Sequence, residues 1–149
     1  MVANDPDQLA HDVAQSMVAN EGTGAAWSLK VEEVREAYAR VSMFVRDDML
    51  NGFGTAHGGM IFALADSAFA YACNSRNKRA VAANAAITFL APAQAGQRLV
   101  AEATERATSG RTGVYSVSVR TTEGVVVAEF QGMSREIGGP VLRQGKEHD

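Results

Sequence analysis

The chain is poor in cysteine, histidine and long apolar runs. Its 149 residues include one cysteine, Cys73, and three histidines. A single cysteine excludes an internal disulfide, and because no cysteines and histidines have the spacing of a zinc site, we expect no metal. We also expect no cofactor. The apolar run at 60–73 is too short to span a bilayer, and no basic segment followed by an apolar core opens the chain. With a formal net charge of −3 and scattered basic residues, the sequence predicts a cytoplasmic protein with no nucleic-acid partner and no membrane partner.

The length fits one domain, residues 1–149, with a tail from about residue 138. Asp5 and Pro6 are typical of a helix start, because Asp caps helices and Pro favours the first helical position. An apolar stretch without proline predicts a long helix that ends near residues 74–78. Apolar alternation predicts six strands. The order helix, two strands, helix, four strands predicts an α+β domain with an antiparallel sheet around one central helix. The strands are expected at 26–34, 36–46, 80–90, 97–108, 112–121 and 125–136.

Asp66 is the only charged residue in the long apolar helix. A lone carboxylate there costs free energy unless it is hydrogen-bonded or its basicity is used. Gly58 and Gly59 precede this helix and leave the N–H groups of its first turn uncrowded, at the positive end of the helix dipole. That end suits an oxygen that gains negative charge. The residues therefore indicate a catalytic site, although two glycines also fit an ordinary turn before a helix.

The segment around this helix has a recognisable pattern. Starting at Leu50, it reads LNGxxxxHGGxxFxLADxAFAYACNS, with Asn51 six residues before His57 and Asp66 nine residues after it. The pattern resembles the PaaI-type acyl-CoA thioesterases of phenylacetate degradation, in the hot dog superfamily, and the likeness covers roughly residues 20–140. The resemblance implies a hot dog fold, with five to six antiparallel strands wrapped around one long central helix, and a short N-terminal helix. It also implies active sites at a homodimer interface, with dimers commonly paired into tetramers.

A thioester hydrolase needs a donor for the oxyanion, an activated nucleophile and groups that orient both. With the resemblance, the backbone N–H of Gly58 is expected to polarise the thioester carbonyl. Asp66 is expected to act as general base or as nucleophile. Asn51 and His57 are expected to position water or substrate, and Ser67 to bond Asp66. Each of these three has another reading: Asn51 fits a turn, His57 fits an N-cap, and Ser67 fits a donor to the carbonyl four residues earlier.

The spacing of the two main candidates predicts an oligomer. Gly58 and Asp66 lie eight residues apart, which is about 12 Å of rise along one helix. Reacting groups must converge to about 3 to 3.5 Å. One chain therefore cannot easily supply both groups to one carbonyl. The simplest solution is a symmetric homodimer in which the helix start of one subunit faces Asp66 of the other.

Five further residues are expected to contact the acyl group or coenzyme A. The resemblance implies a phosphate contact at Arg111, which equally fits an exposed arginine in a turn. Aromatic side chains near the helix suit a flat acyl group, and two others seven residues apart are expected to pack the helix against the sheet instead. The five candidates are Gly59, Arg111, Phe53, Tyr71 and Asn84, and the two packing residues are Phe62 and Phe69.

The chain departs from its relatives at two places. Relatives often carry Arg before the proline of a Phe-Leu-x-Pro segment, where this chain has Ala91. Some carry Ser or Thr on the strand after the helix, where this chain has Ala82 and Ala83 followed by Asn84. Either difference is expected to change affinity or substrate range.

The sequence therefore predicts an acyl-CoA thioesterase that hydrolyses phenylacetyl-CoA or hydroxyphenylacetyl-CoA, with coenzyme A only as part of the substrate. One alternative is a hot dog hydratase or dehydratase, which needs an active-site His on a strand, whereas His57 lies in a turn. Another is a non-catalytic acyl-CoA-binding module, which needs no acid in the helix. Asp66 disfavours the second alternative.

Overall fold

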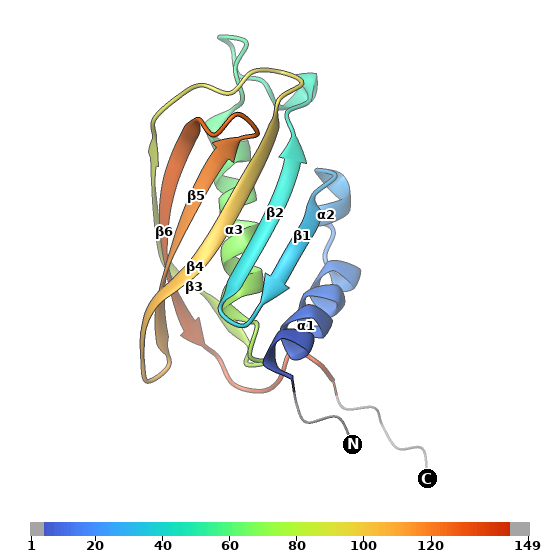
Figure 1. The fold of residues 1–149 in the computed structure, drawn as a ribbon, viewed down its shortest axis with the longest axis vertical. Helices are drawn as coiled ribbons and strands as arrows, with labels where there is room; N and C mark the ends of the chain where they lie inside the picture. The colour runs from blue at the N-terminus through green and yellow to red at the C-terminus, as the bar shows by residue number, and fades with distance from the viewer. Residues whose placement is uncertain (1–4, 144–149) are drawn as a thin grey trace.

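The structure is a computed structural model that describes residues 5–143. One long helix lies against a curved sheet, and two shorter helices lie beside one edge of that sheet (Figure 1). Residues 138–143 of the predicted tail lie outside the strands, and the rest of that tail, with His148, lies outside the described residues. The elements are α1 (Pro6–Asn20), α2 (Thr23–Ala26), β1 (Lys30–Arg35), β2 (Tyr38–Phe44), the 3₁₀ turn η1 (Asp47–Met49), α3 (Gly58–Cys73), β3 (Ala80–Phe89), β4 (Arg98–Ser109), β5 (Thr112–Thr121) and β6 (Val126–Glu136).

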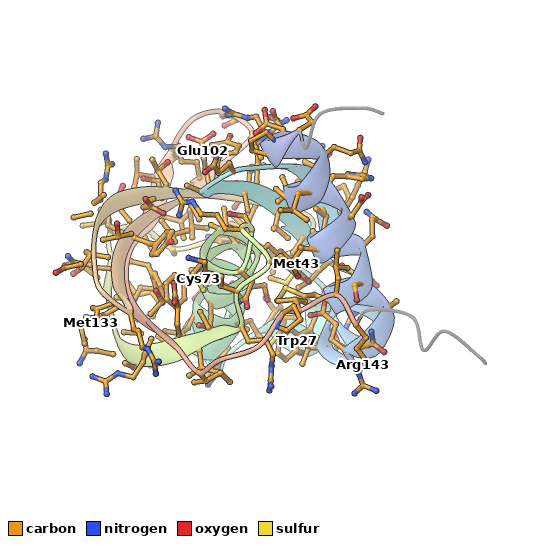
Figure 2. All side chains as sticks on the ribbon, turned by 90° about the horizontal axis from the view of Figure 1, so that it is seen from below. Trp27, Met43, Cys73, Glu102, Met133 and Arg143 are labelled. Atoms are coloured by element: carbon orange, nitrogen blue, oxygen red, sulfur yellow. The ribbon has the colours of Figure 1, made fainter. Side chains whose placement is uncertain are left out.

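The sheet has six strands in the order β1-β2-β4-β5-β6-β3, and every neighbouring pair is antiparallel. A view from below shows α3 nearly end-on, with the sheet curving around it (Figure 2). The α+β architecture predicted from the order of elements, an antiparallel sheet around one central helix, is therefore confirmed. In the part of the chain that the structure describes, no helix is long and apolar enough to cross a membrane.

Apolar and small side chains fix α3 against the sheet. Leu64, Ala65 and Ala68 are fully buried, and the alanines let the helix backbone lie close to the strands. Phe62 contacts Phe130 of β6 edge-to-face, with ring centroids 5.4 Å apart. Phe69 contacts both Tyr115 of β5 and Phe130, at 5.5 and 5.8 Å between ring centroids. The prediction that Phe62 and Phe69 pack the helix against the sheet is confirmed.

The beginning of the first strand was predicted wrongly. Residue 26 ends the short helix α2, and β1 begins only at Lys30. Ser28, between them, has a φ of 53°, a left-handed conformation that no strand continues through. A helix of four residues is too short to show the helical periodicity of apolar residues. The alternation of apolar and polar residues around Trp27 therefore predicted a strand instead.

The two edges of the sheet differ in their protection. At the β1 edge, α1 packs its buried residues Ala10, Val13 and Ala14 against the fold. Its start is as predicted, because the side chain of Asp5 caps the helix and accepts a hydrogen bond from the N–H of Asp7. At the other edge, β3 pairs with β6 and with no other strand in the part of the chain that the structure describes. Most of its side chains are exposed although the strand is largely apolar. Such an edge offers unpaired backbone groups to another strand.

Candidate active site

Asn51 organises the loop that leads into α3. Its side-chain Oδ1 accepts hydrogen bonds from the N–H groups of Phe53 and Thr55, at 2.9 and 3.2 Å. Its Nδ2 donates to Oγ1 of Thr55 at 3.1 Å, and its backbone N–H donates to the carbonyl of Thr55 at 2.8 Å. The structure thus shows the turn role that was the alternative reading for Asn51. The side chain also lines the cavity at the start of α3.

His57 is the N-cap of α3. Its backbone is extended, with φ −60° and ψ 133°, and its Nδ1 accepts a hydrogen bond from the N–H of Gly59 at 2.9 Å. This is the capping role that the sequence offered as an alternative to positioning water. The N–H of Gly59 is therefore used within the protein. A Cβ at Gly59 would lie 3.0 Å from His57 Nδ1, so the glycine also makes room for the capping ring.

Gly58 is the first residue of α3, and its N–H has no acceptor among residues 5–143. The residue lines an open cavity of about 410 Å³, whose wall is mainly apolar. Phe89, at the end of β3, lies directly over Gly58: a Cβ on that glycine would be 3.0 Å from the Phe89 ring. A free N–H at the positive end of a helix, beside a cavity, is suited to polarise a carbonyl oxygen. The lining residues are Asn51, Thr55, Ala56, Gly58, Ile61, Phe89, Leu90, Ala91 and Pro92.

Phe89, which lines the Gly58 cavity, was not among the residues predicted for the site. Its ring is 51% exposed at the open edge of the sheet, in contact with the proposed oxyanion donor. Phe89 is the phenylalanine of the Phe-Leu-x-Pro segment, in which the sequence had drawn attention only to Ala91, where relatives often carry Arg. Ala91 does line the same cavity, so a small residue there leaves the wall uncharged.

Asp66 lies in the middle of α3, half-buried. Its carboxylate has no hydrogen-bond partner and no salt bridge in the part of the chain that the structure describes. Burial raises the pKa of Asp66 above its ordinary value, because an apolar surrounding disfavours the charged form. Ser67 does not bond Asp66; its hydroxyl donates to the carbonyl of Ala63 at 2.8 Å. An unpaired, half-buried carboxylate is a base available for chemistry.

A half-exposed stripe of α3 carries Asp66 along the β6 and β3 side of the fold. Phe62, one turn earlier, packs on Phe130 of β6. Cys73, two turns later, lines a small cavity with Ala80 of β3. Burial, and next the charge of Asp66, raise the pKa of the Cys73 thiol to about 12, so this cysteine is a poor nucleophile. The stripe therefore leads from the aromatic cluster towards β3, whose outer edge has no neighbouring strand among residues 5–143.

The structure does not bring Asp66 to the Gly58 cavity within one chain. The two residues lie on one continuous helix, eight positions apart, which separates them by about 12 Å along its axis. Asp66 is absent from the lining of the cavity at Gly58. One chain thus holds the two halves of the predicted machinery at different points of α3.

Tyr71 does not lie at the Gly58 cavity. Its side chain is 1% exposed and donates a hydrogen bond from its hydroxyl to Glu21, which follows α1. Burial, together with that hydrogen bond, raises the pKa of Tyr71. Positions five apart on a helix point about 140° from each other, so Tyr71 faces away from Asp66. The structure gives Tyr71 a core role, joining α3 to the N-terminal helices.

The other proposed substrate contacts lie at the surface. Phe53 is 94% exposed at the tip of the loop before α3. Asn84 is exposed on β3, next to a shift in the register between β3 and β6. Arg111 lies in the turn between β4 and β5 and lines the small cavity that also contains Cys73 and Lys78. Each is accessible to a ligand or to a second subunit.

An ionic network fixes the end of α3 to the sheet, and sequence reasoning did not find it. Arg76 binds Glu105 at 2.6 Å and Glu36 at 2.9 Å. Glu105 also accepts a hydrogen bond from the hydroxyl of Tyr115 at 2.8 Å. The hydrogen bond from Arg76 holds the pKa of Glu105 below its usual value. The partners are 29 and 40 residues apart in sequence, so no local pattern connects them.

Comparison with known proteins decides the family. Residues 53–128, half of the chain, match the family model described as the thioesterase superfamily. The chain belongs to this superfamily. It is 41% identical to the acyl-coenzyme A thioesterase PaaI of Escherichia coli K12 over 128 residues, which cover 86% of this chain and 91% of that protein.

Solved structures of the thioesterase superfamily agree with this assignment. The E. coli PaaI protein from the phenylacetic acid degradation operon superposes with a TM-score of 0.90 at 40% identity, over 91% of this chain and 99% of that one. A mutant of the phenylacetic acid degradation protein PaaI from Thermus thermophilus gives a TM-score of 0.76 at 42% identity, over 78% of this chain and all of that one. The predicted hot dog fold and the resemblance to the PaaI type are confirmed.

Proposed function

We propose that this protein is an acyl-CoA thioesterase that hydrolyses aryl-acetyl-CoA thioesters, with phenylacetyl-CoA or hydroxyphenylacetyl-CoA as substrate. The observation that carries the proposal is a pair of groups on α3 that have no partner among residues 5–143: the N–H of Gly58 and the carboxylate of Asp66. Both are groups that thioester hydrolysis requires. The similarity to the E. coli acyl-CoA thioesterase PaaI supports the same chemistry.

In the proposed reaction the N–H of Gly58 donates a hydrogen bond to the thioester oxygen and stabilises its negative charge. As a general base, Asp66 takes a proton from water while the water oxygen attacks the carbonyl carbon. The tetrahedral intermediate then expels the thiolate of coenzyme A, which takes up a proton. As a nucleophile, the carboxylate would attack the carbonyl carbon directly, expel the thiolate of coenzyme A, which takes up a proton, and form an anhydride that water then cleaves. In both routes Asp66 must be ionised, so its raised pKa increases its basicity and sets the acidic limit of activity.

We propose further that two subunits share each site. The unpaired, apolar edge of β3 suits a second copy of the same strand. Antiparallel pairing about a two-fold axis places the Ala80 end of one β3 beside the Phe89 end of the other. Cys73, at the end of the Asp66 stripe, lies beside Ala80, and Gly58 lies beneath Phe89. In the paired strands, the Asp66 stripe of one subunit therefore approaches the start of α3 in its partner. This brings together the groups that one chain keeps apart, and two such dimers would make the tetramer expected from the resemblance.

The proposed contact for the CoA arm is a pair of basic residues on the same side of the fold. Lys78 and Arg111 both line the small cavity that contains Cys73 of the Asp66 stripe. Neither makes a salt bridge among residues 5–143, unlike Arg76 beside them. Two free cations near the end of the stripe suit the phosphates of coenzyme A. In the dimer, exposed Phe53 and Asn84 are placed to complete the walls around the acyl group.

A panel of acyl-CoA thioesters tests the proposed substrate. Free thiol release should give kcat/KM for phenylacetyl-CoA at least tenfold above that for acetyl-CoA and for palmitoyl-CoA, a difference of about 1.4 kcal/mol. A ring gains buried area and aromatic contacts in a cavity bordered by Phe89. If palmitoyl-CoA is the better substrate, the aryl assignment is wrong while the thioesterase chemistry stands. If no thioester is cleaved, an acyl-CoA-binding module becomes the better reading.

A further inference from the structure

A second cavity lies at the other end of β3, away from Gly58. It has a volume of about 800 Å³, within the range of small-molecule sites. Four segments form it: the end of α1, the connection from α3 to β3, the start of β3, and the segment that follows β6. Figure 2 looks at this end of the molecule and shows Arg143 beside α1. We call this cavity the terminal groove; the lining that matters here is Met17, Val81, Ile137 and Leu142 with Arg79 and Arg143.

Hydrogen bonds hold the walls of the terminal groove in place. The N–H of Ile137 donates to the carbonyl of Arg79 at 2.8 Å, and the N–H of Arg79 donates to the carbonyl of Gly139 at 3.1 Å. The N–H of Leu142 donates to the side-chain oxygen of Asn77 at 2.8 Å. The segment after β6 is thus tied to the turn before β3 at three points. The groove is part of the fold rather than a gap beside a loose segment.

Among residues 5–143, the charged side chains that line the terminal groove have one sign. Arg79 and Arg143 come from different segments, and no acidic side chain among residues 5–143 contributes to the lining. This is notable in a chain whose formal net charge is −3. A guanidinium offers paired donors that match the two oxygens of a carboxylate. The rest of the lining is largely apolar, so the groove combines an anion-binding rim with a surface for an apolar body.

We propose that the terminal groove binds a small organic carboxylate that carries an apolar body, such as an arylacetate. The carboxylate lies between Arg79 and Arg143, and the body lies on Val81, Ile137 and Leu142. The groove is distinct from the Gly58 cavity, because the two lie at opposite ends of β3, a strand of ten residues that spans about 30 Å. Carboxylates of this class are what the proposed hydrolysis releases, but binding at the terminal groove does not depend on Asp66.

The chain offers an unusually clean probe of this proposal, because it contains three isoleucines. Ile137 lines the terminal groove, Ile61 lines the Gly58 cavity, and Ile87 lies on β3. Methyl NMR of isoleucine-labelled protein therefore reports the two cavities separately during a titration with phenylacetate. The Ile137 methyl signal should shift and saturate. With 2-phenylethanol, which has the ring but no charge, the Kd from Ile137 should be at least tenfold weaker.

The arginines are tested by a double variant, Arg79→Gln with Arg143→Gln. Its Kd for phenylacetate, read from Ile137, should rise at least tenfold while any response of Ile61 stays the same. The matched control, Arg106→Gln with Arg120→Gln, removes two exposed arginines outside the groove. It should change neither the Kd for phenylacetate nor the response of Ile61.

Three outcomes would overturn the proposal. A static Ile137 signal would show that the groove does not take the carboxylate. Equal Kd values for phenylacetate and 2-phenylethanol would show an apolar cavity without anion recognition. A double variant with a lower Tm but an unchanged Kd would show that Arg79 and Arg143 only offset the negative carboxyl end of α1. Thioesterase activity is measured separately, so failure of the proposed hydrolysis leaves this test unaffected.

Discussion

Replacing Asp66 by asparagine should lower turnover strongly and leave the protein at least as stable as before. The amide keeps the shape of the side chain but cannot accept a proton or attack a carbonyl. A positioned base contributes about 10² to 10⁴ in rate, so kcat should fall by about 10²-fold or more, equivalent to about 2.7 kcal/mol in the transition state. KM should change little, because a base acts mainly in the transition state.

The stability part of this prediction follows from the environment of the carboxylate. Asp66 has no hydrogen-bond partner among the described residues, and burial raises its pKa above the ordinary 3.8. The pKa of Asp66 is higher in the folded protein than in the unfolded chain. The group therefore contributes its full stability at a pH below its pKa in the unfolded chain, and that contribution is lost as the pH rises through its pKa in the folded protein. Near neutral pH the charged carboxylate therefore destabilises the fold, and Asp66→Asn should raise Tm.

Thiol release and thermal unfolding of the same preparations give both readouts. Asp12→Asn is the matched control, because Asp12 also lies mid-helix but on the exposed face of α1. This control should keep full activity and an unchanged Tm. The wild-type kcat should fall on the acidic side at a higher pH than an ordinary aspartate would give. An Asp66→Asn protein that retains most of its turnover would refute the assignment of Asp66 as base or nucleophile.

Two further changes test how α3 is held. Gly132→Ala should lower the free energy of unfolding by about 1 to 3 kcal/mol, because a Cβ there would lie 2.8 Å from the buried ring of Phe69. Gly52→Ala is the control, because Gly52 has open space around it. Denaturant unfolding of the two variants measures the difference. Arg76→Met should lower stability by about 1 kcal/mol near neutral pH, because it removes the partner of Glu105. Since the pKa of Glu105 is lowered in the fold, that difference should shrink as pH falls below 4.5, and a difference that persists in acid would contradict the ionic role.

Local sequence patterns predicted the main elements well. β5 was placed at its observed bounds, and α1 was started correctly from the cap at Asp5. Alternating or periodic apolar residues over ten or more positions produce signals of this kind. The short elements α2 and η1 were missed, because three or four residues carry no measurable period.

For the candidate site, the sequence predicted Gly58 and Asp66 but not all of the contacts that the structure shows around them. Asp66 stands out because a lone acid in an apolar helix violates a local rule, and Gly58 because a pair of glycines opens that helix. Tyr71 was misplaced because its position was considered without the angle between it and Asp66 around the helix. Phe89 was missed because its contact with Gly58 joins a strand end to a helix start 31 residues away. Contacts of that kind depend on the sheet topology, which local patterns do not contain.

The site at the proposed dimer interface can be tested with two inactive variants. Asp66→Ala lacks the acid, and Gly58→Pro lacks the N–H that binds the oxyanion. Proline suits the first position of a helix, and the extended His57 before it suits a residue that precedes proline. Because any side chain at Gly58 meets the ring of Phe89, Gly58→Ala serves as the control: it adds the same Cβ and keeps the N–H.

Turnover of co-expressed Asp66→Ala and Gly58→Pro chains is the most direct measurement of the central claim. Each mixed dimer contains one site with both groups intact, so random pairing should restore about a quarter of the wild-type kcat per chain. Each variant alone should remain inactive, and Gly58→Ala should retain clearly more activity than Gly58→Pro. Folded mixed dimers without any recovered turnover would contradict a site built from Asp66 of one subunit and Gly58 of its partner.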